Sequence, residues 1–210
     1  AGANAGLFFI GNFVCDIPGG MLLIWPELMS SSTLKETVRR EEIEPLPDYY
    51  GPPFCRPFAA ILNSRRPRSD CKEDNWKKAT VRAARFCARE GYTVLTSVKP
   101  SNWDYAVKAC LSEGARQIIF LPGFSGEDYR ETARVLRASF GLTCEEAGFY
   151  FFPTEVSPAK PKAAWPARDR IICREASLLL PVSVRPGGNI FRYTRLFSTA
   201  VDDRFRIPYP

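Results

Sequence analysis

The chain has 210 residues, 45% of them hydrophobic, and carries 29 lysines and arginines against 23 aspartates and glutamates, for a net charge of +6. This size and composition predict one globular domain, or one domain with an extension, and the charge favours an anionic partner. The chain has no histidine, which excludes Ser-His-Asp catalysis, Cys-His catalysis and every histidine-containing metal site.

The seven cysteines are scattered, and no two of them form a Cys-x-x-Cys pair. An odd number without paired spacing argues against a zinc site and against a complete disulfide framework. Several cysteines fall at apolar positions of predicted elements, where cysteine behaves as a small hydrophobe. We therefore expect no metal and no other cofactor, and we infer a reducing, cytoplasmic compartment.

The N-terminal part of the chain predicts an extension rather than a membrane anchor. The apolar run in the first thirty residues is interrupted by Asp16, Pro18 and two glycines, which makes it too broken to span a bilayer. No lysine or arginine precedes it, so it is a poor secretory signal. A polar stretch and the proline-rich "PLPDYYGPPFCRP" follow. We assign residues 1–57 to an N-terminal extension and connector, and residues 58–210 to the main domain.

From Phe58 onward, short apolar runs alternate with segments of helical spacing. The runs predict strands over 57–62, 92–98, 117–123, 148–153, 178–184 and 203–210. The intervening segments predict helices over 75–91, 101–114, 125–141 and 167–177, with one more after residue 189. Ser125 and Asp128 have capping-box spacing, and glycines close the first three helices.

This alternation predicts a Rossmann-like, doubly wound α/β fold with a mostly parallel sheet. Ligands of such sheets bind beyond the carboxyl ends of the strands, which directs attention to the turns 63–69, 96–102, 122–126 and 185–189. Pro181 conflicts with its predicted strand because it removes a ladder donor. The strand is therefore at an edge there, or the predicted boundaries are wrong.

Positive charge gathers in two places. The stretch "LNSRRPRS", residues 62–69, puts three arginines after the first predicted strand. They either bind an anion or belong to an ordinary solvated loop. Residues 160–195 hold eight basic residues against Asp169 and Glu175, an excess equal to the net charge of the whole chain. The eight are Lys160, Lys162, Arg168, Arg170, Arg174, Arg185, Arg192 and Arg195.

Taken in order, several motifs over residues 58–208 resemble the Rossmann-like domain of DNA-processing protein A (DprA, also called Smf), within the SLOG nucleotide-binding superfamily. "AAILNSRRPRS" resembles the first strand of that family and its Gly-Ser-Arg turn. "AARFCAREGYTVLTS" resembles the next helix and strand, and "WPARDRIICREAS" is similar to the Phe-x-x-Arg-Asn-Arg-Ile-Ile signature. "RPGGNIFRYTR" and "DRFRIPYP" resemble a later turn and the closing strand.

The resemblance implies a protein that binds single-stranded DNA or a nucleotide without catalysis, through phosphate contacts at the strand ends. The resemblance also makes a recombinase partner and a homodimer possible, and it implies that the protein does not act at a membrane. The residues expected to contact phosphate, with Lys99 added as a point charge, are Ser64, Arg65, Ser97, Lys99, Arg168, Arg170, Gly187 and Gly188.

The sequence departs from the family pattern at the expected site. Asn63 stands where the family has glycine, and "TSVKPSNWD" keeps Ser97 and Asp104 but loses the glycines that let backbone N–H groups approach a phosphate. Asp169 replaces an asparagine and adds a negative charge. Arg168 and Arg170 therefore have an alternative role in structural ion pairs with Asp169, Glu175 or Glu155.

Two alternatives to nucleic-acid binding stay open. The first is a SLOG-type enzyme acting on a small nucleotide, such as an N-glycoside hydrolase or phosphoribohydrolase, for which Glu155 is the best remaining carboxylate. "RPGGN" resembles the Pro-Gly-Gly of the LOG phosphoribohydrolases, but no catalytic glutamate follows it. The second is a degenerate scaffold that works through a protein partner. Trp103 is expected in the core, whereas Trp165 and Tyr193 lie among basic residues, where they either pack or stack on unpaired bases.

Overall fold

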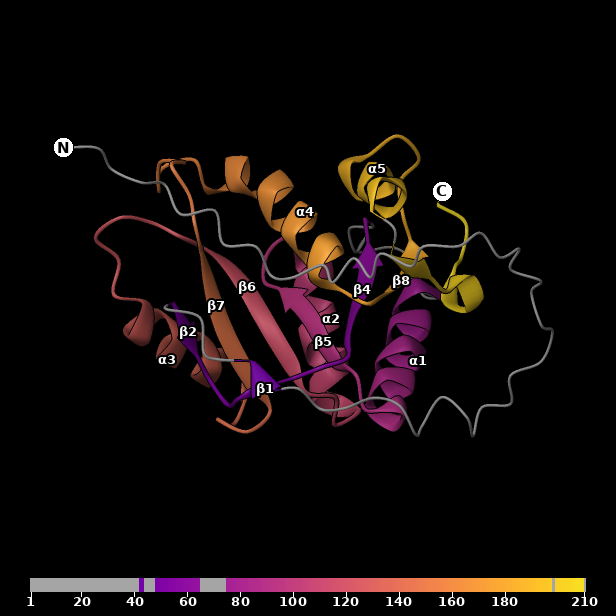
Figure 1. Ribbon diagram of the computed structural model, residues 1–210, viewed down its shortest axis with the longest axis horizontal. Coiled ribbons are helices and arrows are strands. Elements are labelled where there is room, and N and C mark those ends of the chain that lie inside the picture. Colours follow the sequence, from indigo (N-terminus) through magenta and orange to yellow (C-terminus); the bar gives the residue numbers. More distant parts are fainter. Residues whose placement is uncertain (1–41, 44–47, 65–74, 198, 210) are drawn as a thin grey trace, which may run out of the picture. The chain divides into compact units, whose positions relative to one another are not determined.

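The computed structural model of the chain describes residues 42–43, 48–64, 75–197 and 199–209 (Figure 1). The apolar first thirty residues lie outside the described residues, and so do all residues of the arginine-rich stretch after Ser64, including Arg65. Among the described residues, no helix combines the length and the apolar character needed to cross a membrane.

A seven-stranded sheet forms the centre of the fold. Its strands lie in the order β2 (Tyr49–Tyr50), β7 (Ala147–Pro153), β6 (Gln117–Gly123), β5 (Thr93–Ser97), β4 (Phe58–Asn63), β8 (Leu178–Ser183) and β9 (Ala200–Val201). Strands β4 to β9 are parallel, and β2 pairs antiparallel with β7. The predicted mostly parallel sheet is confirmed.

Helices cover both faces of this sheet. Helices α1 (Asn75–Glu90), α2 (Ser101–Ser112) and α3 (Tyr129–Phe140) connect β4 to β7 in sequence. Helix α4 (Trp165–Glu175), preceded by the 3-10 turn η2 (Pro161–Ala164), leads to β8, and α5 (Asn189–Leu196) leads to β9.

The side chains of β4 show how the two layers divide. Side chains alternate along a strand, so Ala59 and Ile61 pack with the Trp76 side of α1, while Ala60 and Leu62 pack with Ile172 of α4. The residues of β4 are buried on both faces, as a central parallel strand requires. The doubly wound α/β fold is thus confirmed by the strand order and by the two packed layers.

The chain reverses direction across the sheet between β4 and β8. It steps from β4 through β5 and β6 to β7, then returns to place β8 on the other side of β4. The loops that follow β4 and β8 therefore leave in opposite directions, which makes their carboxyl ends the switch point where doubly wound folds bind ligands. The backbone N–H of Ser64 donates to the Ser183 carbonyl at 2.8 Å and ties these two ends together.

Pro181 lies inside β8, and the structure explains why it is tolerated. The Leu179 carbonyl accepts from the Asp202 N–H on the β9 side, and residues two apart on a strand face the same way. Pro181 therefore faces the side beyond the short β9, where no ladder partner needs its missing N–H. The first of the two predicted explanations holds, since the strand is at an edge at this point.

Three other details differ from the sequence prediction. The predicted strand over 203–210 is wrong: Asp203–Phe205 form the 3-10 turn η3, and the last strand is β9. The cap of α3 is Asp128, which accepts from the Glu131 N–H, so this helix starts after Ser125. Two residues of the predicted connector, Tyr49 and Tyr50, join the main sheet as β2. Nearby, β1 (Glu42–Ile43) pairs antiparallel with β3 (Phe54–Cys55).

Three cysteines serve as core residues. Cys87, Cys110 and Cys173 are free and buried. Burial raises the pKa of Cys87 and of Cys173 to about 12, and it raises the pKa of Cys110 as well. These thiols stay protonated at neutral pH and are unreactive, which agrees with their predicted role as small hydrophobic side chains.

Candidate functional site

The loop after β5 runs from Ser97 to the start of α2 and lies next to the switch point. Ser97 is fully buried, and its hydroxyl donates to the Phe120 carbonyl of the neighbouring strand at 2.7 Å. The side chain of Asn102, in the first turn of α2, donates to the Asn63 carbonyl at the end of β4. Hydrogen bonds on both sides thus hold this loop against the carboxyl edge of the sheet.

Arg168 reaches this loop from α4, on the opposite face of the sheet. Its Nη1 donates to the Lys99 carbonyl at 2.7 Å and lies 3.4 Å from the Ser97 hydroxyl. Its Nε and Nη2 both donate to Asp169 Oδ1, at 2.9 and 2.7 Å. The side chain of Arg168 is only 3% exposed, so the guanidinium lies inside the protein with protein partners. The predicted alternative, an ion pair with Asp169, is the geometry that the structure has.

Two indole rings complete the surroundings of this guanidinium. The Arg168 Cζ atom lies 5.1 Å from the ring centroid of Trp103 and 5.6 Å from that of Trp165. A cation over an indole ring is attracted by the ring electrons, and more strongly where water is excluded. Trp103 was expected in the core and is found there. Trp165 was predicted either to pack or to stack on unpaired bases, and in the structure it packs against Arg168.

Burial acts on both charges of this pair. Loss of water is the largest influence on each: it lowers the pKa of Arg168 and raises the pKa of Asp169, while the attraction between the two charges opposes both changes. An ion pair in such a place is costly to break because either partner alone would be an uncompensated buried charge. The Arg168–Asp169 pair therefore acts as a fixed structural element behind the loop.

Lys99 occupies the position that this network controls. Its φ is 48°, which lies in the left-handed region that glycine adopts most easily. In this loop a lysine adopts that conformation instead of a glycine. Its N–H donates to Asp104 Oδ1 at 2.8 Å, and its carbonyl accepts from Arg168. The backbone N–H of Lys99 is thus engaged within the protein, whereas its side chain is exposed. Through this side chain Lys99 is available as a point charge.

A second turn follows β8 on the other side of the switch point. Residues 185–188 form it, with Gly187 at φ 72° and with the Gly188 N–H donating to the Arg185 carbonyl at 3.1 Å. Gly188 then caps α5 without a side-chain hydrogen bond. Arg185 and Gly187 are exposed, so this turn presents backbone and a cation to solvent.

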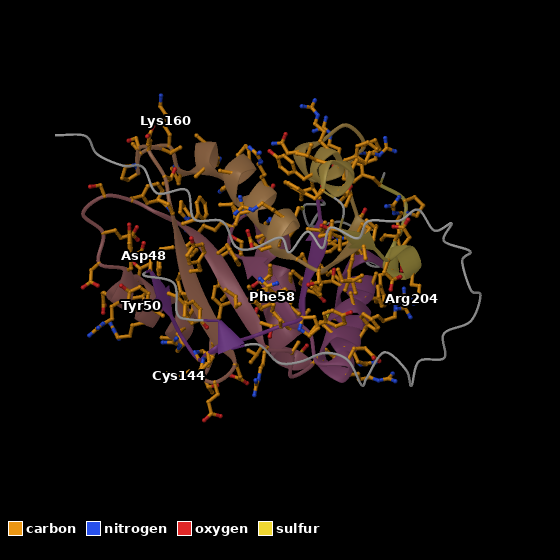
Figure 2. The ribbon with its side chains drawn as sticks, in the orientation of Figure 1. Asp48, Tyr50, Phe58, Cys144, Lys160 and Arg204 are labelled. Atoms are coloured by element: carbon orange, nitrogen blue, oxygen red, sulfur yellow. The ribbon has the colours of Figure 1, made fainter. Side chains whose placement is uncertain are left out.

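The remaining predicted residues divide by position. Ser64 is half-buried directly after β4 and thus lies at the switch point. Arg170 is exposed on α4, next to the buried Asp169. Arg65 lies outside the described residues. Figure 2 shows Lys160, the first residue of the basic segment, projecting away from the ribbon just before η2.

Glu155, the carboxylate proposed for catalysis, lies away from these residues. It is exposed and follows β7, and strands β6 and β5 separate β7 from β4. Within the part of the chain that the structure describes, no three cysteine, aspartate or glutamate side chains are placed to hold a metal ion.

Some residues that shape this region were not predicted from the sequence. Asp104 was noted only because it is kept from the family loop, and its role in holding the Lys99 N–H was not foreseen. Asp202 and Asp203 form ion pairs with Arg204 and Arg206 at 2.5 and 2.7 Å. The close spacing of these four residues is a signal that sequence reasoning missed.

No protein-family model matches the chain, and no curated protein matches it. Among solved structures, DNA processing protein A from Helicobacter pylori, described for its single-stranded DNA binding mode, matches with a TM-score of 0.45 and 15% identity over 66% of this chain. The same protein from Streptococcus pneumoniae matches with a TM-score of 0.45 and 18% identity over 66% of this chain. The molybdenum cofactor carrier protein from Chlamydomonas reinhardtii matches with a TM-score of 0.43 and 17% identity over 70% of this chain.

These matches cover 59%, 46% and 74% of the three proteins, so the chain spans less than two thirds of the two DNA processing proteins. The fold assignment rests on the strand order and layers of the chain itself.

Proposed function

We propose that the chain is a DprA-like, non-catalytic protein that binds single-stranded DNA or a nucleotide through phosphate contacts at the carboxyl edge of its sheet. The observation that supports this most directly is the turn after β8 at the switch point. There Gly187 and Arg185 are exposed next to the start of α5. Glycine backbone and a guanidinium are both groups that suit a phosphate.

In this proposal the predicted residues have different roles. Lys99 and Arg185 contact phosphates from the two sides of the switch point, and Ser64 lies between them. Arg168 holds the loop that carries Lys99 instead of touching the ligand, because its guanidinium is buried and engaged with Asp169 and the Lys99 carbonyl. Arg170 is a peripheral contact, and the role of Arg65 stays a prediction.

The experiment is fluorescence anisotropy with labelled oligo-dT, titrated at several salt concentrations, with labelled AMP as a parallel probe. Binding through phosphates releases counterions, so the affinity for a single strand should fall with a logarithmic slope of about 0.7 per phosphate contact. The double variant Lys99→Ala with Arg185→Ala should reduce that slope by about 1.4.

A matched control removes the same two types of charge elsewhere. Arg89 lies in the last turn of α1 and Lys108 lies on α2, and both are exposed on the layer that α1 and α2 form. The double variant Arg89→Ala with Lys108→Ala should leave the slope unchanged. An equal loss in both double variants would show that only the net charge matters, and the site assignment would then be wrong.

The AMP probe separates this proposal from the small-nucleotide enzyme. Binding of AMP without oligo-dT would favour that enzyme, although Glu155 lies away from the switch point. A second candidate function is the scaffold with a protein partner, because Arg168, which was expected at a phosphate, is engaged within the protein. Binding of neither probe would favour the scaffold. A homodimer and a recombinase partner stay predictions.

A further inference from the structure

A pocket of about 430 Å³ lies beside α5, on the side of the turn that carries Arg185 and Gly187. The segment after β9 forms its second wall by docking on β8, where the Ile207 N–H donates to the Val182 carbonyl at 2.7 Å. Since Pro181 offers no N–H and β9 has already ended, no strand among the described residues pairs with this side of β8. A volume of this size is typical of sites for small molecules, about 300–1,000 Å³.

The walls of this pocket, which we call the α5 pocket, are mostly apolar and partly aromatic. Phe191 of α5 and Tyr209 of the C-terminal segment contribute rings, and Pro181, Val184 and Pro186 contribute aliphatic surface. The polar groups are Thr194 and the Arg206–Asp203 ion pair at 2.7 Å, whose side chains are 49% and 58% exposed. A flat apolar body with hydrogen-bonding groups on its edge would match this lining.

Arginines lie in the segments of the chain that line the pocket. The Arg195 guanidinium lies 4.4 Å from the ring centroid of Phe191, which itself lines the pocket. Arg192 follows Phe191 on α5, and Arg185 precedes Pro186; both are exposed. The chain from 184 to 209 carries five arginines against two aspartates, and both aspartates are paired with arginine. An occupant should therefore carry negative charge next to its flat apolar part.

A nucleotide unit of a single strand has these properties together. Its base is flat, with donors and acceptors on its edge, and its phosphates lie on either side along the strand. Stacking of unpaired bases on aromatic side chains within a positively charged groove is the general mode of single-strand binding. An aliphatic chain would offer no hydrogen bond to Arg206, Asp203 or Thr194, and bases in a duplex are already stacked on each other.

We propose that the α5 pocket takes an unpaired base of a single-stranded nucleic acid, whose neighbouring phosphates lie on Arg185, Arg192 and Arg195. This inference rests on the proposed function, since it requires that the chain bind nucleic acid at this edge. It adds a source of preference for single strands that the phosphate contacts alone do not supply.

The test compares labelled oligo-dT with a labelled strand of the same length made of abasic units, which keeps the phosphates and removes the bases. The full chain should bind oligo-dT more tightly by about 5-fold to 150-fold, the value of one stacked base. Tyr209→Ala should bring the two affinities together, and Tyr209→Phe should keep the difference because it keeps the ring.

The matched control is Tyr50→Ala, which truncates another half-buried tyrosine at the far edge of the sheet, in β2. Figure 2 shows Tyr50 on the opposite side of the sheet from Arg204, which belongs to the C-terminal segment. This variant should keep the preference for oligo-dT. A loss of preference in Tyr50→Ala as large as in Tyr209→Ala would overturn the pocket assignment.

Other outcomes separate this inference from the proposed function. Equal affinity of the unmodified chain for both strands would overturn the α5 pocket and leave phosphate binding intact, whereas binding of neither strand would overturn both. A dimer in sedimentation that Tyr209→Ala dissociates would mean that a second copy fills the pocket, which also overturns the inference. Irradiation with a 5-iodouracil strand should cross-link Phe191 or Tyr209, and a cross-link confined to other residues would contradict it.

Discussion

Arg168 and Arg185 belong to the same basic segment of the sequence, yet they occupy opposite environments. Arg168 is buried between two indole rings, next to Asp169, and its guanidinium donates to the loop that carries Lys99. Arg185 is exposed on an open glycine turn across the switch point. The first supports the architecture, and the second remains free to meet solvent or an anion.

The comparison shows that a local excess of charge in a sequence need not be an excess on a surface. Of the ten charged residues between positions 160 and 195, Arg168 and Asp169 neutralise each other in the interior. The other basic residues of the segment are exposed, and Glu175 accepts from Arg174 at 2.7 Å. Removing the buried pair therefore leaves the net positive charge of the segment unchanged, and all of it lies outside.

The largest effect should come from Arg168→Ala. Loss of the guanidinium leaves Asp169 as an unpaired buried carboxylate and removes the support of the Lys99 carbonyl, so the free energy of unfolding should fall by about 3–5 kcal/mol. Urea unfolding followed by tryptophan fluorescence measures this, and Arg170→Ala, two residues away and exposed, is the control. A loss below about 1 kcal/mol would mean that the buried pair does not hold this region.

Gly187→Ala tests the other side of the comparison. An added methyl meets no atom within 4 Å, so the cost should come from the left-handed backbone alone, about 1–2 kcal/mol. Gly114→Ala, at φ 69° after α2 and likewise with open space around it, should lose the same stability. Only Gly187→Ala should also weaken binding of oligo-dT; equal binding by the two variants would remove this turn from the site.

Lys99→Gly separates the backbone of the loop from its charge. Glycine accepts the left-handed conformation, so the free energy of unfolding should stay the same or rise by about 1 kcal/mol or less. Binding of oligo-dT should still weaken, because the cation is lost. Thermal unfolding and anisotropy on the same sample decide the matter, and unchanged binding would mean that Lys99 is only a loop residue.

The smallest effect on stability is expected for Arg185→Ala. An exposed residue without a buried partner should change the free energy of unfolding by no more than about 0.5 kcal/mol. If the turn binds phosphate, the salt dependence of oligo-dT binding should nevertheless lose about 0.7 of its slope. A drop in stability comparable to that of Arg168→Ala would erase the contrast between the two arginines.

Much of the fold was predictable from local patterns. The apolar runs predicted the strands β4 to β8, and the helical spacing predicted the helices α1 to α4. These segments are long and periodic enough for their secondary structure to be read from the sequence. The chain end was predicted less well. "DRFRIPYP" has the pattern of a strand in isolation, but Asp202 and Asp203 form ion pairs with Arg204 and Arg206 at a 3-10 turn. The strand that pairs with β8 is instead the two-residue β9.

The sequence by itself determined the doubly wound α/β layout and the edge of the sheet where a site belongs, since hydrophobic period and strand alternation are local properties of the chain. Only the tertiary structure decided which charges face water. Arg168 reaches Ser97 and Lys99 across about seventy residues of sequence, and Tyr209 returns to α5 beside β8. Burial and hydrogen-bond partners arise from contacts between distant segments, and no local pattern records them.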